Sequence, residues 1–276
     1  MRSMDPLLII ALVAVGIGAS VIGTIFGLGG GIIFIPVLTV LFGLSASAAA
    51  AVSLVGIVAT STGAASVYVK NGSTNVRLGL LLEITTSVGA MVGAFLAAYL
   101  ASWFLLCVFA CVLLYSAANM IFRKEKIIAD SGDGGSMNFQ YTDGKDRAEK
   151  RYNVVNIKSG LAICTGAGIL SSMTGVGGGA IKVPLMNVHM HVPIKVASAT
   201  SSYMIGITAF SGAIIYFIHG SLLLDYAGAV AVGALFGSMI GTRIAKMLDA
   251  GPMRKYFSIL LLAIAVIILI EAGGVL

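Results

Sequence analysis

Charged residues are scarce in this chain: only 10% of its 276 residues are Asp, Glu, Lys or Arg, whereas 58% are hydrophobic. Soluble domains carry roughly 25% charged residues, so the composition excludes an ordinary soluble fold. Apolar stretches of about 20 residues recur along almost the whole length, and each can cross roughly 30 Å of hydrocarbon as a helix. Uninterrupted apolar runs such as 259–270 lack the alternation of a barrel strand. We therefore predict an all-α polytopic membrane protein.

Residues that build metal, redox or nucleic-acid sites are also few. The three cysteines, Cys107, Cys111 and Cys164, all fall inside apolar spans, where they are interpreted as small packing residues. His189 and His191 share one predicted turn, and two histidines alone are too few for a metal site. The net charge of +6 comes from basic residues in short loops, which is typical of topology signals. We predict no cofactor, no metal and no nucleic-acid partner.

The chain contains an internal duplication. Sliding the sequence by 148 positions places Gly29-Gly30-Gly31 on Gly177-Gly178-Gly179 and Pro36 on Pro184 without a gap. The one long polar segment separates the two copies. The predicted organisation is a first transmembrane repeat over 1–122, a polar cytoplasmic linker over 123–157 and a second transmembrane repeat over 158–276. The predicted helical spans are 7–26, 32–42, 46–69, 78–101 and 103–122, then 159–174, 180–190, 196–218, 226–248 and 253–270.

Basic residues mark cytoplasmic loops, and they constrain how the repeats are oriented. The linker is rich in Lys and Arg and is placed inside. If each glycine-interrupted element returns to the side it entered from, Lys195 and the 246–255 turn are also cytoplasmic, and only Arg2 remains as an external basic residue. This count predicts two inverted repeats with both termini outside. Each repeat has a Gly-broken (re-entrant or hairpin) helix plus three transmembrane helices.

The two glycine breaks are the candidate anion site. A helix start has unpaired N–H groups and a positive dipole end, and inverted repeats whose broken helices meet at the midplane are the usual site architecture of secondary transporters. The alternative is that triple glycines simply permit tight helix crossing. The pairs Gly89/Gly93 and Gly237/Gly241 are assigned to that packing role. The candidate backbone contacts with substrate are Gly29, Gly30, Gly31, Gly177, Gly178 and Gly179.

Side chains near the breaks extend this candidate site. The hydroxyls of Ser53, Thr200 and Ser201 either donate to an oxyanion or bond to their own helix. Lys182 follows the second break and either attracts the substrate or snorkels to the inner surface. Glu83 is predicted to lie close to a helix end, where a carboxylate snorkels or caps.

The segments GLGGGIIFIP at 27–36 and GVGGGAIKVP at 175–184 resemble the sulfite exporter TauE/SafE family, as do Ala49-x-Ala51-x-Ser53 and 197–201 after each break. The resemblance implies a multi-pass plasma-membrane permease for sulfite, sulfonates or related sulfur oxyanions, and not an enzyme. Its partners would be a small-molecule anion and the lipid bilayer, with a homo-oligomer left open.

Two other functions stay as alternatives. One is a non-transporting membrane assembly or sensor protein. The other is a membrane-embedded enzyme, which would need a cluster of Asp, Glu or His within the spans, where Glu83 is the one candidate.

Overall fold

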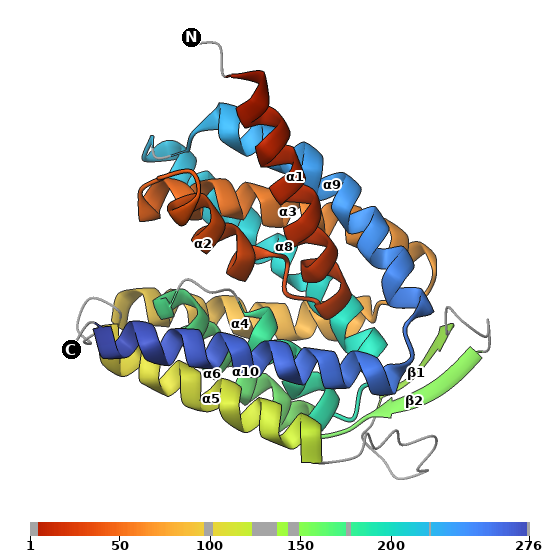
Figure 1. The fold of residues 1–276 in the computed structure, drawn as a ribbon. Helices are drawn as coiled ribbons and strands as arrows, with labels where there is room; N and C mark the ends of the chain where they lie inside the picture. The colour runs from red at the N-terminus through yellow and green to blue at the C-terminus, as the bar shows by residue number, and fades with distance from the viewer. Residues whose placement is uncertain are drawn as a thin grey trace.

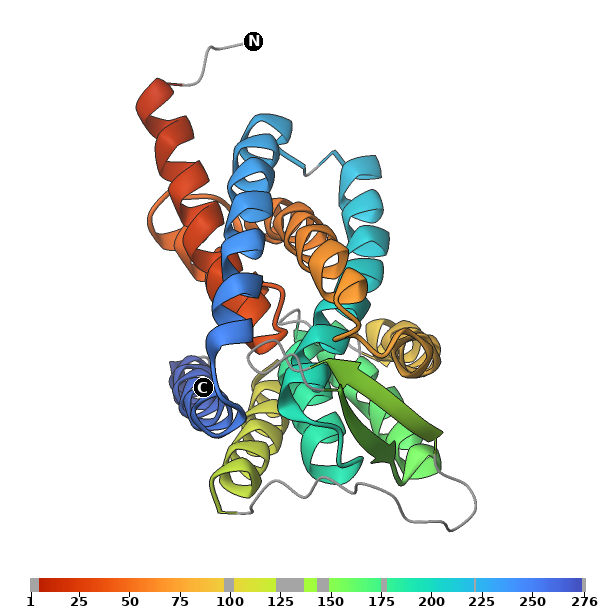
Figure 2. The ribbon, with the colours of Figure 1, turned by 90° about the vertical axis from the view of Figure 1, so that its right-hand side faces the viewer.

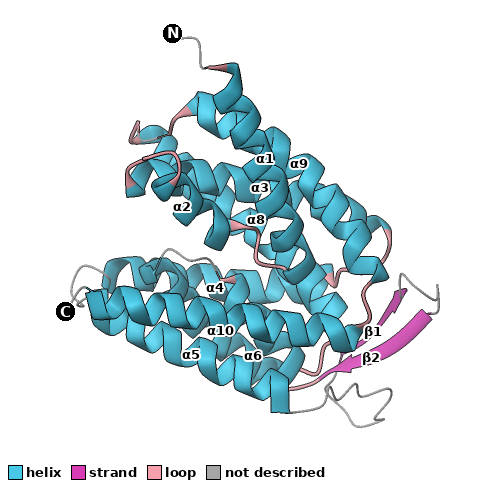
Figure 3. Cartoon of the chain, in the orientation of Figure 1, coloured by secondary structure: helices cyan, strands magenta, loops and turns pink. Residues whose placement is uncertain are grey.

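The computed structural model of the protein describes residues 5–96, 102–122, 137–142, 149–174, 178–220 and 222–274, and helices dominate it (Figure 3). The first repeat holds α1 (Pro6–Phe26), α2 (Gly31–Val40), α3 (Ala46–Lys70), α4 (Val76–Leu96) and α5 (Ser102–Phe122). The second holds α6 (Ile157–Thr174), α7 (Gly179–Pro184), the π-helix η1 (Leu185–His189), α8 (Ile194–Ile218), α9 (Leu224–Met247) and α10 (Ala250–Gly274). Between them lie strands β1 (Met137–Thr142) and β2 (Glu149–Val154).

Six helices of the described ranges are long and apolar enough to cross a membrane, and they belong to α1, α3, α4, α8, α9 and α10. This confirms a mostly helical, multi-pass membrane protein. The predicted helix over 180–190 is corrected, because α7 ends at Pro184 and the chain continues as the π-helix η1. A proline inside a helix removes one backbone donor and crowds the preceding turn, which accounts for the altered winding there.

Local sequence explains where the first helix begins and ends. The Asp5 carboxylate accepts a hydrogen bond from the Leu7 amide at 3.1 Å, and Pro6 occupies the first helical position. Both residues are favoured at a helix start. The helix ends at Gly27, whose φ of 72° lies in the left-handed region that glycine adopts without strain.

The main helix contacts join one repeat to the other. Helix α1 packs on α9, α4 on α6, α5 on α10, and α3 on both α8 and α9. The duplication relates the α1–α9 contact to the α6–α4 contact. In Figure 1, α1, α2, α3 and α9 occupy the upper part of the molecule and α4, α5, α6 and α10 the lower part. Each repeat therefore contributes to both parts.

Glycines allow these cross-repeat helices to approach closely. A Cβ added at Gly16 of α1 would lie 2.6 Å from the carbonyl oxygen of Val230 in α9. An added Cβ would likewise overlap a facing carbonyl oxygen at Gly237, which contacts α1, and at Gly89, which contacts α6. The packing role predicted for Gly89 and Gly237 is thus confirmed.

The linker contributes a two-stranded antiparallel hairpin, an addition to the predicted all-α fold. Tyr141 and Tyr152 are buried, and the Asn75 side chain donates to the Tyr152 hydroxyl at 2.9 Å. Burial raises the pKa of the Tyr152 phenol well above its usual range, so the phenol stays protonated near neutral pH. Figures 1 and 2 both place the hairpin at one end of the helices, close to the start of α8.

Candidate functional site

The first glycine break reverses the chain. The amides of Leu28 and Gly29 both donate to the carbonyl oxygen of Gly23, at 2.8 and 3.2 Å. Gly30 then lies against α1, because an added Cβ there would be 3.0 Å from the carbonyl oxygen of Ala19. Gly27, Gly29 and Gly30 all have φ between 71° and 87°, a region that other residues seldom adopt. The backbone itself therefore requires glycine here, and α2 runs back beside α1.

An unpaired hydroxyl faces the start of α2. No side chain caps the helix at Gly30, and its first full residue is Gly31. The Ser53 side chain is buried, and its Oγ has no hydrogen-bond partner among the described residues. A Cβ at Gly31 would lie 3.6 Å from that Oγ. Of the predicted hydroxyls, Ser53 is the one left available for a ligand.

The two breaks contact each other. Gly177 lies outside the described residues, whereas Gly178 and Gly179 begin α7. An added Cβ at Gly179 would lie 2.5 Å from the carbonyl oxygen of Gly27. The Gly178 backbone has an ordinary φ of −73°, and an added Cβ there would lie 2.9 Å from Cε of Lys182. Glycine at position 178 thus leaves room for the lysine side chain.

The hydroxyls of Thr200 and Ser201 form cross-links within the protein. Ser201 Oγ donates to the carbonyl oxygen of Gly27 at 2.7 Å, and Thr200 Oγ1 accepts from the Asn75 amide at 3.0 Å. Both contacts join α8 to the first repeat. For Ser201 this bond differs from both predicted alternatives, a free oxyanion donor and a bond within the same helix. The two hydrogen bonds position the first break and the α3–α4 turn.

A buried ion pair lies next to the second break. Lys182 Nζ is 2.7 Å from Glu83 Oε2, and the two side chains are only 1% and 4% exposed. Thr208 Oγ1 donates to the other carboxylate oxygen, Glu83 Oε1. The prediction that Glu83 snorkels or caps at a helix end is wrong, because α4 buries it against the second repeat. Snorkelling of Lys182 is equally excluded by its burial.

Sequence reasoning placed Lys182 in the candidate site but did not pair it with Glu83, and it did not place the Thr208 hydroxyl on that carboxylate. The available signal was charge complementarity, since an isolated acid and an isolated base within apolar spans are expected to pair. In the described part of the chain, no cluster of three or more His, Cys, Asp or Glu side chains could hold a metal ion. The groups that the structure brings together here are a lysine ammonium, a carboxylate and the Thr208 hydroxyl.

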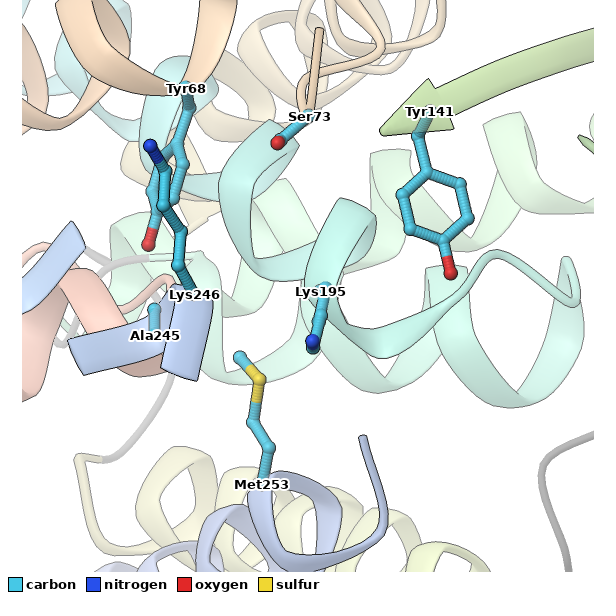
Figure 4. A pocket seen from close by; sticks show the side chains of 7 residues that line it. All are labelled: Tyr68, Ser73, Tyr141, Lys195, Ala245, Lys246 and Met253. Atoms are coloured by element: carbon cyan, nitrogen blue, oxygen red, sulfur yellow. The ribbon is translucent and has the colours of Figure 1, made fainter. Parts of the chain in front are cut away.

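A small pocket marks the end of the molecule where the hairpin packs (Figure 4). It is lined by Tyr141 of the linker, Ser73 of the α3–α4 turn, Lys195 at the start of α8 and Lys246 at the end of α9. Segments that the basic-residue count assigns to the cytoplasm thus gather at one end.

Comparison with known proteins decides the family. A family model described as the sulfite exporter TauE/SafE matches residues 12–268. The chain belongs to this family. The matched range contains both glycine breaks and the Glu83–Lys182 pair. No solved structure is significantly similar to the chain.

Relatives of this TauE/SafE family member carry transporter names. The probable membrane transporter protein YunE of Bacillus subtilis is 29% identical over 263 residues, covering 92% of this chain and 95% of that protein. The sulfite exporter TauE/SafE family protein 5 of Arabidopsis thaliana is 29% identical over 116 residues, covering 41% of this chain and 26% of that protein. The probable membrane transporter protein MamO of Magnetospirillum gryphiswaldense is 27% identical over 107 residues, covering 36% of this chain and 17% of that protein. Together these names support a membrane transporter of the TauE/SafE type.

Proposed function

We propose that this chain is a secondary transporter for a small anion in the plasma membrane, with sulfite, a sulfonate or a related sulfur oxyanion as substrate. The observation that carries the proposal is the contact between the two glycine breaks, at Gly27 and Gly179, beside the buried ammonium of Lys182. A helix start supplies positive potential through its unpaired N–H groups, and an ionisable pair buried within apolar spans, here Lys182 with Glu83, is a candidate functional site.

The proposed site draws on both repeats. The first repeat offers the backbone N–H groups at the start of α2, at Gly30 and Gly31, and the unpaired hydroxyl of Ser53 on α3. Gly29 contributes the turn that precedes them, since its own amide donates to the carbonyl oxygen of Gly23. The second repeat offers the backbone of Gly178 and Gly179 and the Lys182 ammonium. Ser201 holds the first break against α8, and Thr200 holds the α3–α4 turn against the same helix. Because α2 has 10 residues, or about 15 Å at 1.5 Å per residue, the break it follows would lie near the middle of the bilayer.

Counterflow in proteoliposomes tests the function. Vesicles that contain the purified protein and are loaded with unlabelled sulfite are expected to accumulate radiolabelled sulfite, whereas protein-free vesicles should not. Competition with thiosulfate, methanesulfonate, sulfate and chloride then ranks the substrates, with the sulfur oxyanions expected to compete best. Absence of counterflow for every anion in the panel would remove the transporter proposal and leave an assembly or sensor protein.

The proposed inverted topology makes a separate prediction. In a variant whose native cysteines are replaced, Ser47→Cys and Asp225→Cys are expected to react with a membrane-impermeant maleimide in intact cells. Arg151→Cys, in the hairpin, should react only after the cells are permeabilised. All three positions are exposed: Ser47 and Asp225 lie near the starts of α3 and α9, and Arg151 lies within β2. Labelling of Arg151→Cys in intact cells, or protection of Ser47→Cys, would contradict the orientation.

A further inference from the structure

Resting on the proposed anion transport, we propose that Glu83 is the proton-binding residue that couples transport to protons. In this mechanism the transported anion displaces the Glu83 carboxylate from Lys182, and Glu83 takes up one proton for each monovalent anion bound.

The geometry shows that Glu83 occupies the donors an oxyanion would use. Its Oε2 accepts from the Lys182 ammonium at 2.7 Å, and its Oε1 accepts from the Thr208 hydroxyl. An ammonium and a hydroxyl converging on a pair of carboxylate oxygens are also suitable donors for two oxygens of a small oxyanion. The carboxylate of the first repeat thus stands where the substrate would bind to the second.

Binding of an anion beside the Glu83–Lys182 pair requires a proton to keep the net charge of the site at zero. The pair is neutral as it stands, with one positive and one negative group, and both side chains are almost fully buried. Adding a monovalent anion to the ionised pair would leave one uncompensated negative charge in apolar surroundings, which is strongly unfavourable. If the Glu83 carboxylate binds H⁺ and becomes a neutral carboxylic acid, the net charge returns to zero. The carboxylate forms one new O–H bond, and a hydronium ion on the side where the anion enters loses that proton and becomes water.

The neighbouring elements contain few competing titratable groups. Lys182 approaches from α7, and Cys164 of α6 lies close enough to interact with both members of the pair. On α8, Tyr203 packs beside Gly79, one helical turn before Glu83, and Lys195 is at the far end near the hairpin pocket. Among the described residues, Glu83 is therefore the carboxylate placed to exchange with an anion at Lys182.

The coupling also has a structural link to the second break. The Lys182 side chain passes the backbone of Gly178, where an added Cβ would lie 2.9 Å from Cε. Movement of the ammonium away from Glu83 is thus mechanically connected to the backbone that begins α7. A pair that only stabilised the fold would not need to stand beside the break.

Proton uptake on anion binding is the direct test. We would titrate sulfite into purified wild-type protein and the Glu83→Gln variant by isothermal calorimetry, in buffers with different ionisation enthalpies. Any protonation of sulfite itself contributes equally to the two titrations, so it cancels when wild type and Glu83→Gln are compared. Wild type is expected to take up about one proton more per sulfite bound, and the ratio of the two dissociation constants should change about tenfold per pH unit, with wild type binding more tightly as pH falls. Asp225→Asn, which removes an exposed carboxylate, should match wild type.

In proteoliposomes, Glu83→Gln should lose the accumulation of sulfite that a pH gradient drives in wild type. Equal proton uptake by wild type and Glu83→Gln would overturn the coupling role. If the variant does not fold, wild-type vesicles containing a trapped pH-sensitive dye decide the question with methanesulfonate, which stays ionised. Acidification during its uptake supports the proposal, and uptake without acidification overturns it. Failure of wild type to bind or exchange any anion would instead reject the proposed function.

Discussion

Replacing Lys182 with methionine is expected to weaken sulfite binding roughly five- to 150-fold. A charge-assisted contact with a partly hydrated anion contributes on the order of 1–3 kcal/mol, and methionine keeps the length of the side chain while removing the ammonium. The same change leaves the buried Glu83 carboxylate without its partner. We therefore also expect the free energy of unfolding to fall by roughly 3–5 kcal/mol where Glu83 stays ionised.

Two controls separate the binding effect from the folding effect. The double variant Lys182→Met/Glu83→Gln contains no buried charge at this position, so its stability should recover while its sulfite affinity stays low. Lys158→Met removes an exposed charge and should change the dissociation constant by less than about twofold. Direct binding of sulfite at fixed ionic strength is the measurement. Unchanged affinity in Lys182→Met would leave backbone N–H groups and the Ser53 hydroxyl as the remaining ligands.

Replacing Gly233 with leucine is expected to abolish most of the folded protein. A Cβ at this position of α9 would overlap the carbonyl oxygen of Val13 in α1. A side chain could relieve such an overlap by changing rotamer, whereas a backbone atom of a packed helix cannot. Overpacking typically lowers the free energy of unfolding by about 1–3 kcal/mol and occasionally by more. Because the obstruction is backbone, we expect roughly 3 kcal/mol or more here.

The same helix supplies a matched control. Gly228 is exposed, and an added Cβ there would have no heavy atom within 4 Å. Gly228→Leu gains the same helix propensity as Gly233→Leu but meets no neighbour. Size-exclusion profiles and melting temperatures of both purified variants are the measurement. Equal melting temperatures would show that α1 and α9 do not pack as closely as described.

The helices were predictable because their signals are local. The apolar run at 7–26 and the glycines that follow it correspond to α1, Pro6–Phe26, and to the reversal that begins at Gly27. Length, apolarity and the scarcity of charge are enough to define such a span. The hairpin was not predicted, although apolar residues alternate at Phe139 and Tyr141 and again at Tyr152 and Val154. The surrounding mixed charge obscured this period of two.

The candidate site was predictable only in part, because its contacts join distant positions. Lys182 lies beside the second break in the structure because it follows Gly179 by only three residues in the sequence. Glu83 and Thr208 meet only after α4 and α8 have packed together. For the same reason, the hydrogen bond from Ser201 to the carbonyl oxygen of Gly27 could not be distinguished from a free hydroxyl.

The interlocking of the two repeats also has a consequence for biosynthesis. Helix α1 packs chiefly on α9, and α5 packs chiefly on α10. A ribosome makes α1 first, yet almost the entire chain must be translated before α9 emerges. The early helices must therefore insert into the bilayer before they can pack on their partners. Until then, the glycine-containing faces of these helices contact lipid. A nascent chain stopped after the first repeat would contain α1 and α5 without the helices on which they chiefly pack.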